Sequence, residues 1–358
     1  MNDEHSIDEH SVDERSIDEH TVSPASGGNQ ARTPEGKHAM SQLTAVRNAS
    51  RTHSTGQWWT LSIYTGGFDV ADGIIGELVT PLAAQAQSLG AQRWFYTRCS
   101  EPANAHVRLR LLAAPDIIDR LQSLLGALQE QASGVIGHLE VTHQFSQPVA
   151  DRMGPGGMEQ RSSRVEADLA KYGGVEGLAL AEEVFELSSE LGAWATARFP
   201  KVQNRWALGS LLLFDAARSM MKGPRSASWP DRRRVSWDYY WDSHLRSCTA
   251  GFGPRAASVR QAMTVQVAAK VAPTQRLMAA TAAESAVENW RRRWFRTIDT
   301  YLYRADKARL SRSAQHLTVY QAHMLLNRLG LSLREEAALG LYARSWSTDR
   351  EALLLDRH

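Results

Sequence analysis

The stretch His-Val-Arg-Leu-Arg-Leu, residues 106–111, decides the fold that the sequence predicts. Its basic side chains, His106, Arg108 and Arg110, alternate with aliphatic ones. A period of two is typical of a β-strand, so the three basic groups should share one face of a sheet. Arginines on a strand face are costly to bury unless polar or anionic groups meet them. The face is therefore either a solvated surface with ordinary ion pairs or a surface that receives a polar or anionic ligand.

The residues around this stretch predict the rest of a sheet. The run Trp-Phe-Tyr-Thr-Arg at 94–98 predicts the neighbouring strand, joined to residues 106–111 by a turn at 101–104. Further strands are predicted over 58–64 and 137–145, and helices over 69–90 and 117–132. This strand–helix–strand–strand–helix–strand order predicts an α+β fold, with helices packed on one face of a mainly antiparallel sheet.

The second half of the chain has helical periodicity almost throughout. Helices are predicted over 175–198, 204–222, 236–248, 255–270, 281–300 and 312–328. We therefore expect one α+β catalytic domain over 57–358, with a sheet-rich half (57–152) and a helix-rich half (160–358). Residues 1–56, which begin with a charged pentad repeat, are expected to be a disordered tail, and Met40 could be the true start of translation.

The charge of the chain favours an anionic partner. Residues 1–20 hold eight acidic groups and one basic group, so the rest carries 40 basic against 31 acidic groups, a net charge of +9 instead of +2. A basic body attracts nucleic acid or an acidic peptide, or serves solubility alone. No apolar run approaches the roughly 18 residues that span a bilayer, and we expect a cytoplasmic protein with no membrane partner.

Several classes of enzyme lack their motifs. The only cysteines are Cys99 and Cys248, too few for a cysteine-based zinc site or a disulfide framework. The sequence has no Walker loop, no G-x-G-x-x-G after a strand, no H-E-x-x-H and no G-x-S-x-G. We therefore predict chemistry that needs no cofactor and no metal.

Four motifs in order carry a family resemblance. The motifs are the runs at 94–98 and 106–111, Tyr172-Gly173-Gly174 followed by Glu182 and the run at 185–189, and His323-Met324-x-x-Asn327-Arg328-Leu329. They resemble the small lantibiotic-dehydratase-like family, whose elimination-domain fold also occurs as stand-alone thiopeptide biosynthesis proteins. The resemblance covers about 57–200 and 310–345. It implies an elimination-domain-like core with a helical insertion at about 225–305.

The resemblance implies one of two reactions. Elimination enzymes of the family remove glutamate from glutamylated Ser or Thr and leave dehydroamino acids. Pyridine or dehydropiperidine synthases join two dehydroalanines in a formal [4+2] aza-cycloaddition, then expel water and the leader peptide. The implied partner is a leader-bearing, dehydrated, thiazole-containing precursor peptide. Product type, ring size and a homodimer all stay open.

Departures from the family pattern favour the synthase. Elimination domains resemble T-Y-x-R-E-x-x-R-Y-G-G before their glycines, and here Ala167 stands at the first arginine, which serves the glutamate chemistry. Ser188-Ser189 replaces an acidic-Ser pair. A missing cation should cost an elimination heavily. Arg108, Arg110 and His323 remain, and we expect them to bind substrate.

The region 225–305 is rich in aromatic residues, with five of the eleven tryptophans. On a helix, Trp237, Tyr240, Trp241 and His244 share one face. Such a face is either core packing or a surface for flat thiazole rings. The second interpretation gives a substrate-binding set of Trp237, Trp241, Trp290 and Trp294 beside Arg108, Arg110 and His323.

The catalytic candidates follow from the proposed reaction. A 2-azadiene forms when an amide tautomerises, which needs a proton donor and acceptor, and histidine or tyrosine can serve. We predict His244 as proton shuttle, with Tyr240 or Tyr301 as donor. A structural histidine bonded to backbone is the alternative for His244.

Two arginine clusters could bind an acidic leader peptide. The expected leader-binding residues are Arg291, Arg292, Arg293 and Arg296, with Arg232 to Arg234 as a second cluster. A solvated helix face is the alternative. A nucleic-acid-binding protein is the main non-enzyme hypothesis, but no nucleic-acid motif supports it, so no nucleic acid is expected. A scaffold that only binds peptides is the remaining one.

Overall fold

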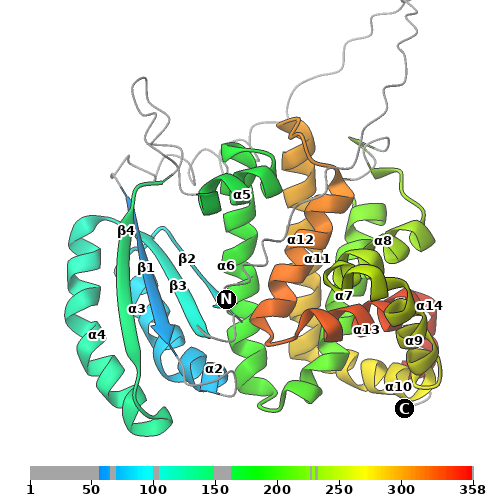
Figure 1. The fold of residues 1–358 in the computed structure, drawn as a ribbon, viewed down its shortest axis with the longest axis horizontal. Helices are drawn as coiled ribbons and strands as arrows, with labels where there is room; N and C mark the ends of the chain where they lie inside the picture. Colours follow the sequence, from blue (N-terminus) through cyan, green and yellow to red (C-terminus); the bar gives the residue numbers. More distant parts are fainter. Residues whose placement is uncertain are drawn as a thin grey trace, which may run out of the picture. The chain divides into compact units, whose positions relative to one another are not determined.

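Four strands form one antiparallel sheet in the order β2-β3-β1-β4 (Figure 1). The strands are β1 (Gln57–Tyr64), β2 (Arg93–Cys99), β3 (His106–Ala113) and β4 (Glu140–Ser146). The computed structural model describes residues 56–64, 70–99, 105–148, 163–225, 228–229 and 233–356. The predicted tail up to residue 55, the predicted turn at 101–104 and residues 149–162 lie outside these residues.

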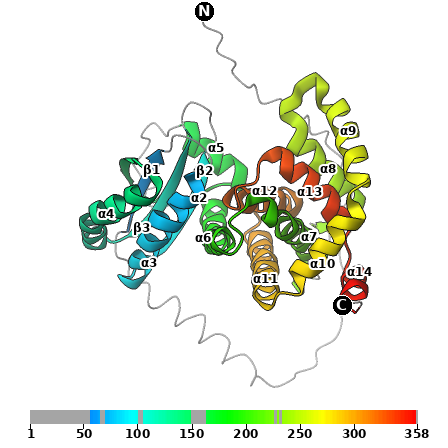
Figure 2. The same cartoon turned by 90° about the horizontal axis from the view of Figure 1, so that it is seen from below.

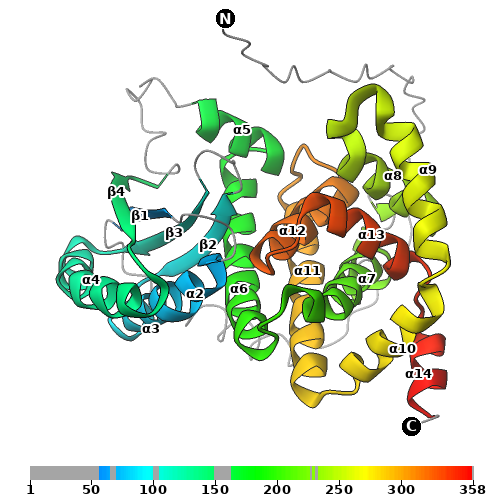
Figure 3. The same ribbon diagram turned by 60° about the horizontal axis from the view of Figure 1, so that its bottom comes forward.

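One face of the sheet is apolar and covered by helices. Val107, Leu109 and Leu111 of β3 are fully buried, whereas the alternate residues are only half-buried, as the period of two predicts. They pack in one cluster with Ile74, Leu78 and other residues of the covering helices. These helices are α2 (Ala71–Ile74), a π-helical turn (Ile75–Val79), α3 (Thr80–Ser88) and α4 (Pro115–Ile136), which lie on this face in Figure 3.

The rest of the described chain is helical. Its helices are α5 (Ser163–Tyr172), α6 (Val175–Arg198), α7 (Trp206–Lys222), α8 (Trp237–Thr249), α9 (Ala256–Ala268), α10 (Val271–Ala282), α11 (Ser285–Lys307), α12 (Ala314–Arg328), α13 (Leu333–Arg344) and α14 (Thr348–Leu355), with 3₁₀ turns at Val202–Arg205 and Ala250–Arg255. They surround a second and larger apolar core. In Figure 2, α6 lies between the sheet and the other large helices. The predicted α+β fold is confirmed.

Helices α6 and α12 pack along the β2 edge of the sheet and satisfy its backbone. The amide of Tyr96 donates to Ser189 Oγ at 3.1 Å. The amide of Arg98 donates to Asn327 Oδ1 at 2.9 Å, and Asn327 Nδ2 donates to the carbonyl of Arg98 at 2.8 Å. The Asn327 side chain thus replaces one residue of a further strand, because it offers both a donor and an acceptor. This edge of the sheet is closed.

A half-buried carboxylate joins the sheet layer to the helical layer. Asp72 of α2 accepts from Arg98 of β2 at 2.7 Å and from both terminal nitrogens of Arg205, which precedes α7. Arg205 is fully buried and also donates to the carbonyl of Leu329. Burial alone would raise the pKa of Asp72, but the two guanidinium groups outweigh it and hold that pKa below its usual value.

No helix among the described residues is both long and apolar enough to cross a membrane.

Candidate functional site

The basic face predicted for β3 exists. His106, Arg108 and Arg110 lie on the face opposite the one covered by α3 and α4. The register of the sheet places each of them in a row that crosses the strands. The rows are Glu140–Tyr64–His106–Cys99, Thr142–Ser62–Arg108–Thr97 and Gln144–Thr60–Arg110–Phe95. Apart from Phe95, the side chains in these rows are half-buried or exposed.

Arg110 connects this face to helix α6. Its guanidinium carbon lies 4.3 Å from the ring centroid of Trp58, and Nη1 lies 3.8 Å from Oε1 of Glu182. Burial raises the pKa of Glu182 to about 7, although Arg110 and Arg93 oppose the rise. Near neutral pH the Glu182 carboxyl is therefore a mixture of acid and carboxylate, able to donate or accept a proton.

Arg108 contacts a neighbouring histidine on the same face. Its Nη2 lies 3.0 Å from Nε2 of His106. Arginine can only donate, so Nε2 of His106 is the acceptor of this hydrogen bond. The face therefore presents two guanidinium groups close to a histidine.

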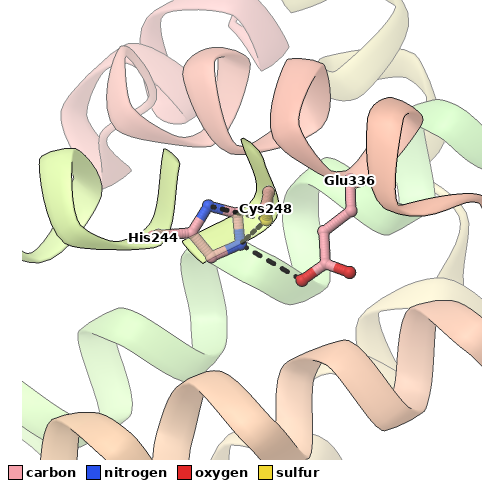
Figure 4. Close-up of side chains that lie close together, drawn as sticks. All are labelled: His244, Cys248 and Glu336. Carbon is pink, nitrogen blue, oxygen red and sulfur yellow. Dashed lines mark hydrogen bonds and ion pairs between the residues drawn. The ribbon is translucent and has the colours of Figure 1, made fainter. Parts of the chain in front are cut away.

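A second group of polar side chains lies among helices α8, α12 and α13 (Figure 4). Glu336, in the first turn of α13, accepts from Nδ1 of His323 at 2.8 Å through Oε2. Its other oxygen, Oε1, lies 3.3 Å from Nε2 of His244. Cys248, one turn after His244 on α8, lies 3.7 Å from the same nitrogen. We call His244, Cys248, His323 and Glu336 the histidine–glutamate cluster.

A glycine on α13 allows the imidazole of His244 to lie close to that helix. A Cβ atom at Gly340 of α13 would lie 2.7 Å from both Nδ1 and Cε1 of His244. Real Cβ contacts are almost never this short, so any larger residue would push the imidazole away from Glu336. The packing of α8 against α13 thus depends on the absence of a side chain at position 340.

The charges of the cluster support one another. Burial alone would raise the pKa of Glu336, but hydrogen bonds from His244 and His323 outweigh it and lower that pKa to about 2. Burial would lower the pKa of His323, but Glu336 raises it above its ordinary value. The side chain of His323 is 40% exposed, whereas that of Glu336 is 2% exposed. An ionised, buried carboxylate therefore orients a solvent-accessible imidazole.

This orientation leaves one imidazole nitrogen for chemistry. A carboxylate can only accept, so Nδ1 of His323 carries the proton that it shares with Glu336. The free nitrogen, Nε2, can take up a proton and return it, while the carboxylate stabilises the imidazolium in between. Arrangements of this kind position histidines that act as general acid–base groups.

His244, Cys248 and Glu336 are also the described residues whose types and proximity could hold a metal ion, because one ligand atom from each lies within 4.8 Å of the others. The sulfur, however, lies at similar distances from the two ring nitrogens of His244, 4.0 Å from Nδ1 and 3.7 Å from Nε2. Sulfur thus lies beside the ring and not in front of a nitrogen lone pair, where a shared metal would need it. Burial also raises the pKa of the Cys248 thiol, so the geometry fits a hydrogen-bonded cluster better than a metal centre.

The predicted aromatic face of α8 also exists, but it faces the protein interior. Trp237, Tyr240, Trp241 and His244 form a continuous series of ring contacts with centroid separations of 5.0–5.5 Å. Tyr240, Trp241 and His244 are buried, as are Trp294 and Tyr301 elsewhere in the helical core. These five side chains therefore pack in the core, which is one of the two interpretations given for the aromatic face. Their proposed roles in binding or proton transfer stay predictions, and in this structure the rings present no surface to a ligand.

Trp237 and Trp290 are only half-buried. Trp237 Nε1 donates to the carbonyl of Arg344 at 2.9 Å. The ring of Trp290 lies between Trp194, at 5.8 Å, and the guanidinium of Arg293, at 4.1 Å. Of the predicted substrate-binding tryptophans, these two keep part of their surface accessible.

The predicted leader-binding arginines divide into two kinds. Arg291 is nearly buried and forms ion pairs with Asp215 and Glu351, both at 2.7 Å. Arg292 and Arg293 are exposed and pair with Glu288 and Glu190, and Arg296 is exposed. In the second cluster Arg233 is buried between Asp299 and Asp306, Arg234 is exposed, and Arg232 lies outside the described residues.

The structure shows the environment of the positions at which this sequence departs from the elimination-domain pattern. Ala167 is exposed on α5, and its methyl side chain supplies no positive charge at the position where the elimination-domain pattern has an arginine. Ser188 and Ser189 are fully buried, and Ser189 Oγ accepts from Arg328 Nε at 2.9 Å. Ser189 therefore holds helix α6 against α12 and β2, whereas Ser188 donates to the carbonyl of Phe185 in its own helix.

Sequence reasoning missed Glu336, which organises the cluster. The run Ser332-x-x-Glu335 does form the capping box that its pattern indicates, and so marks the start of α13. No sequence signal places the next residue beside His244, which is 92 positions away.

Comparisons with known proteins agree with the fold. A family model described as lantibiotic biosynthesis dehydratase C-term matches residues 58–346, which includes the region 225–305 that the motifs left unexplained. The crystal structure of TsrL is similar at 14% identity with a TM-score of 0.55, over 84% of this chain and 99% of TsrL. TbtD, a pyridine synthase from thiomuracin biosynthesis, is similar at 14% identity with a TM-score of 0.50, over 84% of this chain and 100% of TbtD.

A third similar structure is larger. It is the tRNA-dependent lantibiotic dehydratase MibB from Microbispora sp. 107891, at 20% identity and a TM-score of 0.50. The similarity covers 86% of this chain but 29% of MibB. At such identities the three structures show the fold alone. No curated protein matches the sequence.

Proposed function

From the premise that this chain belongs to the lantibiotic biosynthesis dehydratase C-terminal family, a family of peptide-biosynthesis enzymes, we propose that it is a thiopeptide pyridine synthase. Its substrate would be a leader-bearing peptide with thiazoles and two dehydroalanines. The reaction is a formal [4+2] cycloaddition between the dehydroalanines, followed by loss of water and of the leader as an amide, which leaves an aromatic ring and closes the macrocycle.

The observation that carries the proposal is the exposed alanine at 167. Elimination of glutamate develops negative charge on the substrate, and a fixed cation lowers the energy of that charge. In the elimination-domain pattern an arginine stands at this place, and here α5 offers a methyl group. A cycloaddition between neutral alkenes does not need this cation. The similarity in fold to TbtD, a pyridine synthase, over 100% of TbtD also supports the proposal.

The histidine–glutamate cluster supplies the proton transfer that the cycloaddition needs. The amide between the thiazole and one dehydroalanine must become an iminol, which moves one proton from nitrogen to the carbonyl oxygen. Nε2 of His323 takes the amide proton and returns it to the oxygen, while Glu336 holds Nδ1 and stabilises the imidazolium. The partly exposed His323 thus replaces the buried His244 as our proton shuttle. His244 becomes a positioning residue that fixes the other oxygen of Glu336.

The basic sheet face supplies a second place for substrate. Arg108 and Arg110 can donate to peptide carbonyls or to an acidic side chain, and Glu182 beside Arg110 can exchange a proton near neutral pH. The buried ring of Trp58 packs against the Arg110 guanidinium and helps to fix its position. We assign this face to binding and orienting the peptide, since orientation contributes most to a cycloaddition.

The test is mass spectrometry of a thiazole-containing peptide with two dehydroalanines and a leader, mixed with the protein without added cofactor. A synthase releases the leader amide and water. His323→Ala should lower the rate by at least about a hundredfold, whereas His138→Ala, an exposed histidine before β4, should leave it unchanged. Full turnover by His323→Ala would remove His323 from the mechanism.

Glutamate elimination is the second candidate, because Arg108, Arg110 and His323 of the resemblance are retained. Incubation with a glutamylated peptide decides it. Loss of glutamate by the wild-type protein would establish an eliminase, and Ala167→Arg should then increase the rate, since it restores the missing cation.

A further inference from the structure

The two edges of the sheet are treated differently. At the β2 edge, side chains of α6 and α12 bond the outward backbone groups of Tyr96 and Arg98. At the other edge lies β4, which pairs with β1 in an unbroken register from Trp58↔Ser146 to Tyr64↔Glu140. Among the described residues no hydrogen bond reaches the outward backbone groups of β4. Residues 140–146 are exposed or half-buried throughout.

The β4 edge also lacks the features that normally prevent strand addition. Exposed edges are usually protected by lysine, proline, a bulge or a very short strand. The strand Glu-Val-Thr-His-Gln-Phe-Ser has seven residues, none of which is lysine or proline, and its register with β1 contains no bulge. Its only acidic residue is Glu140, at one end, and it has no arginine. The edge is therefore a regular template for a further strand.

The two faces next to β4 differ in chemistry. On one face Val141 and Phe145 pair with the buried residues Ile63 and Trp59, and Phe145 is 46% exposed. On the other face Thr142 and Gln144 begin the rows that contain Arg108 and Arg110, two strands away. Side chains of an added strand would alternate between these faces. A matching strand has apolar residues at every second position and acidic or polar residues between them.

We propose that the β4 edge binds an extended segment of the precursor peptide as a fifth strand, with apolar side chains beside Val141 and Phe145 and acidic ones toward the face of Arg108 and Arg110. This inference rests on the proposed function, because it takes the partner to be the peptide substrate. A second copy of β4 fits the edge less well, since it would bring Thr142 and Gln144, both neutral, to the basic face. When a peptide binds at this edge, the residues that follow the bound segment can reach the face of the sheet that carries Arg108 and Arg110.

The test is hydrogen exchange of the full-length chain, read by mass spectrometry over residues 138–148. The probe is a synthetic peptide of alternating Val and Glu at millimolar concentration, with a control peptide that holds the same residues in two blocks. The alternating peptide should slow exchange in β4 about tenfold, and the block peptide should not. N-methylation of the probe at every second residue should abolish the protection in one register and spare it in the other, because only alternate amides face β4.

A pair of variants distinguishes specific binding at the β4 edge from non-specific hydrophobic binding. Phe145→Lys should weaken binding of the alternating peptide roughly five- to tenfold. Phe252→Lys, which changes another partly exposed phenylalanine outside the sheet, should leave binding unchanged. Equal effects of the two variants would overturn the proposal.

If another segment of this chain or a second copy covers the β4 edge, hydrogen exchange gives a different result, and either result would overturn the proposal that a peptide binds there. Protection of β4 before the probe is added, at every protein concentration, would mean that another segment of this chain covers the edge. Protection that rises with protein concentration, together with a dimeric mass, would mean a second copy. Unchanged exchange while the thiazole peptide is still cyclised would refute the edge and leave the synthase. Protection by the probe without cyclisation of the thiazole peptide would refute the synthase instead.

Discussion

Nδ1 of His323 lies 2.8 Å from Oε2 of Glu336, so a partly exposed imidazole is held by a carboxylate that has almost no contact with solvent. The second oxygen of that carboxylate is occupied by His244. This single acidic group therefore supports both the position of a surface histidine and the packing of α8 against α13.

Glu336→Gln should reduce the free energy of unfolding by about 1.5–3 kcal/mol at pH 5.5, since it removes a buried carboxylate from the hydrogen bond with its partly exposed histidine partner. Glu336 has its pKa lowered from 4.5 to about 2, so its contribution is complete above pH 4.5 and is lost as the pH falls toward 2. His323 has its pKa raised above 6.5, so its contribution is complete below pH 6.5 and is lost as the pH rises through the raised value. Urea unfolding at pH 5.5 and 8.5 should therefore show a larger loss at pH 5.5. Equal losses would contradict the coupling.

Tyr240→Phe should change the free energy of unfolding by less than about 1 kcal/mol. The Tyr240 hydroxyl is buried and makes no hydrogen bond to the described residues, so its removal leaves no partner unsatisfied. Cyclisation should also continue at the wild-type rate, because burial raises the pKa of this hydroxyl and keeps it from acting as an acid. A stable variant that has lost activity would restore Tyr240 as a proton donor.

Glu182→Gln should stabilise the protein above pH 8 by on the order of 1–2 kcal/mol. The pKa of Glu182 is raised from 4.5 to about 7, so the folded chain resists its ionisation and loses stability as the pH rises from 4.5 through 7. At pH 5 the variant and the wild type should be close in stability. Thermal unfolding at the two pH values measures the difference, and an unchanged profile would refute the raised pKa.

Arg291→Glu should destabilise the fold by about 3–5 kcal/mol, because it leaves Asp215 and Glu351 without their cation. Arg293→Glu and Arg296→Glu should each cost less than about 1 kcal/mol, since both residues are exposed. A leader-binding role is therefore tested at the exposed pair. Charge reversal there should weaken binding of an acidic leader, measured by fluorescence anisotropy, most strongly at low salt. Salt-independent binding would contradict the role.

Local periodicity predicted the sheet and most helices. The alternation from His106 to Leu111 gave the strand and assigned its faces correctly, because a half-buried strand must alternate. The helix predicted over 175–198 has those bounds. The helix predicted over 281–300 instead begins at Ser285 and continues to Lys307. Helices α5, α10, α13 and α14 were not predicted as separate elements.

The functional site could be predicted only in part. Helical spacing correctly placed Trp237, Trp241 and His244 on one face of α8, but spacing does not reveal what a face packs against, and this one packs into the core. His323 was predicted for substrate binding without its carboxylate partner. The pairing with Glu336 depends on how α12 and α13 meet, which no local pattern encodes.

Asp72 limits how the protein can be divided. Its carboxylate is held at once by Arg98 of the sheet and by Arg205, which lies beyond α6 in the helical half. A chimaera that took its first 150 residues from a relative without this acid would bury Arg205 with no counter-charge. Exchange of the sheet-rich half between family members should therefore yield a folded hybrid only when Asp72 and Arg205 are transferred together. The two halves of the chain are expected to change together in evolution at these two positions.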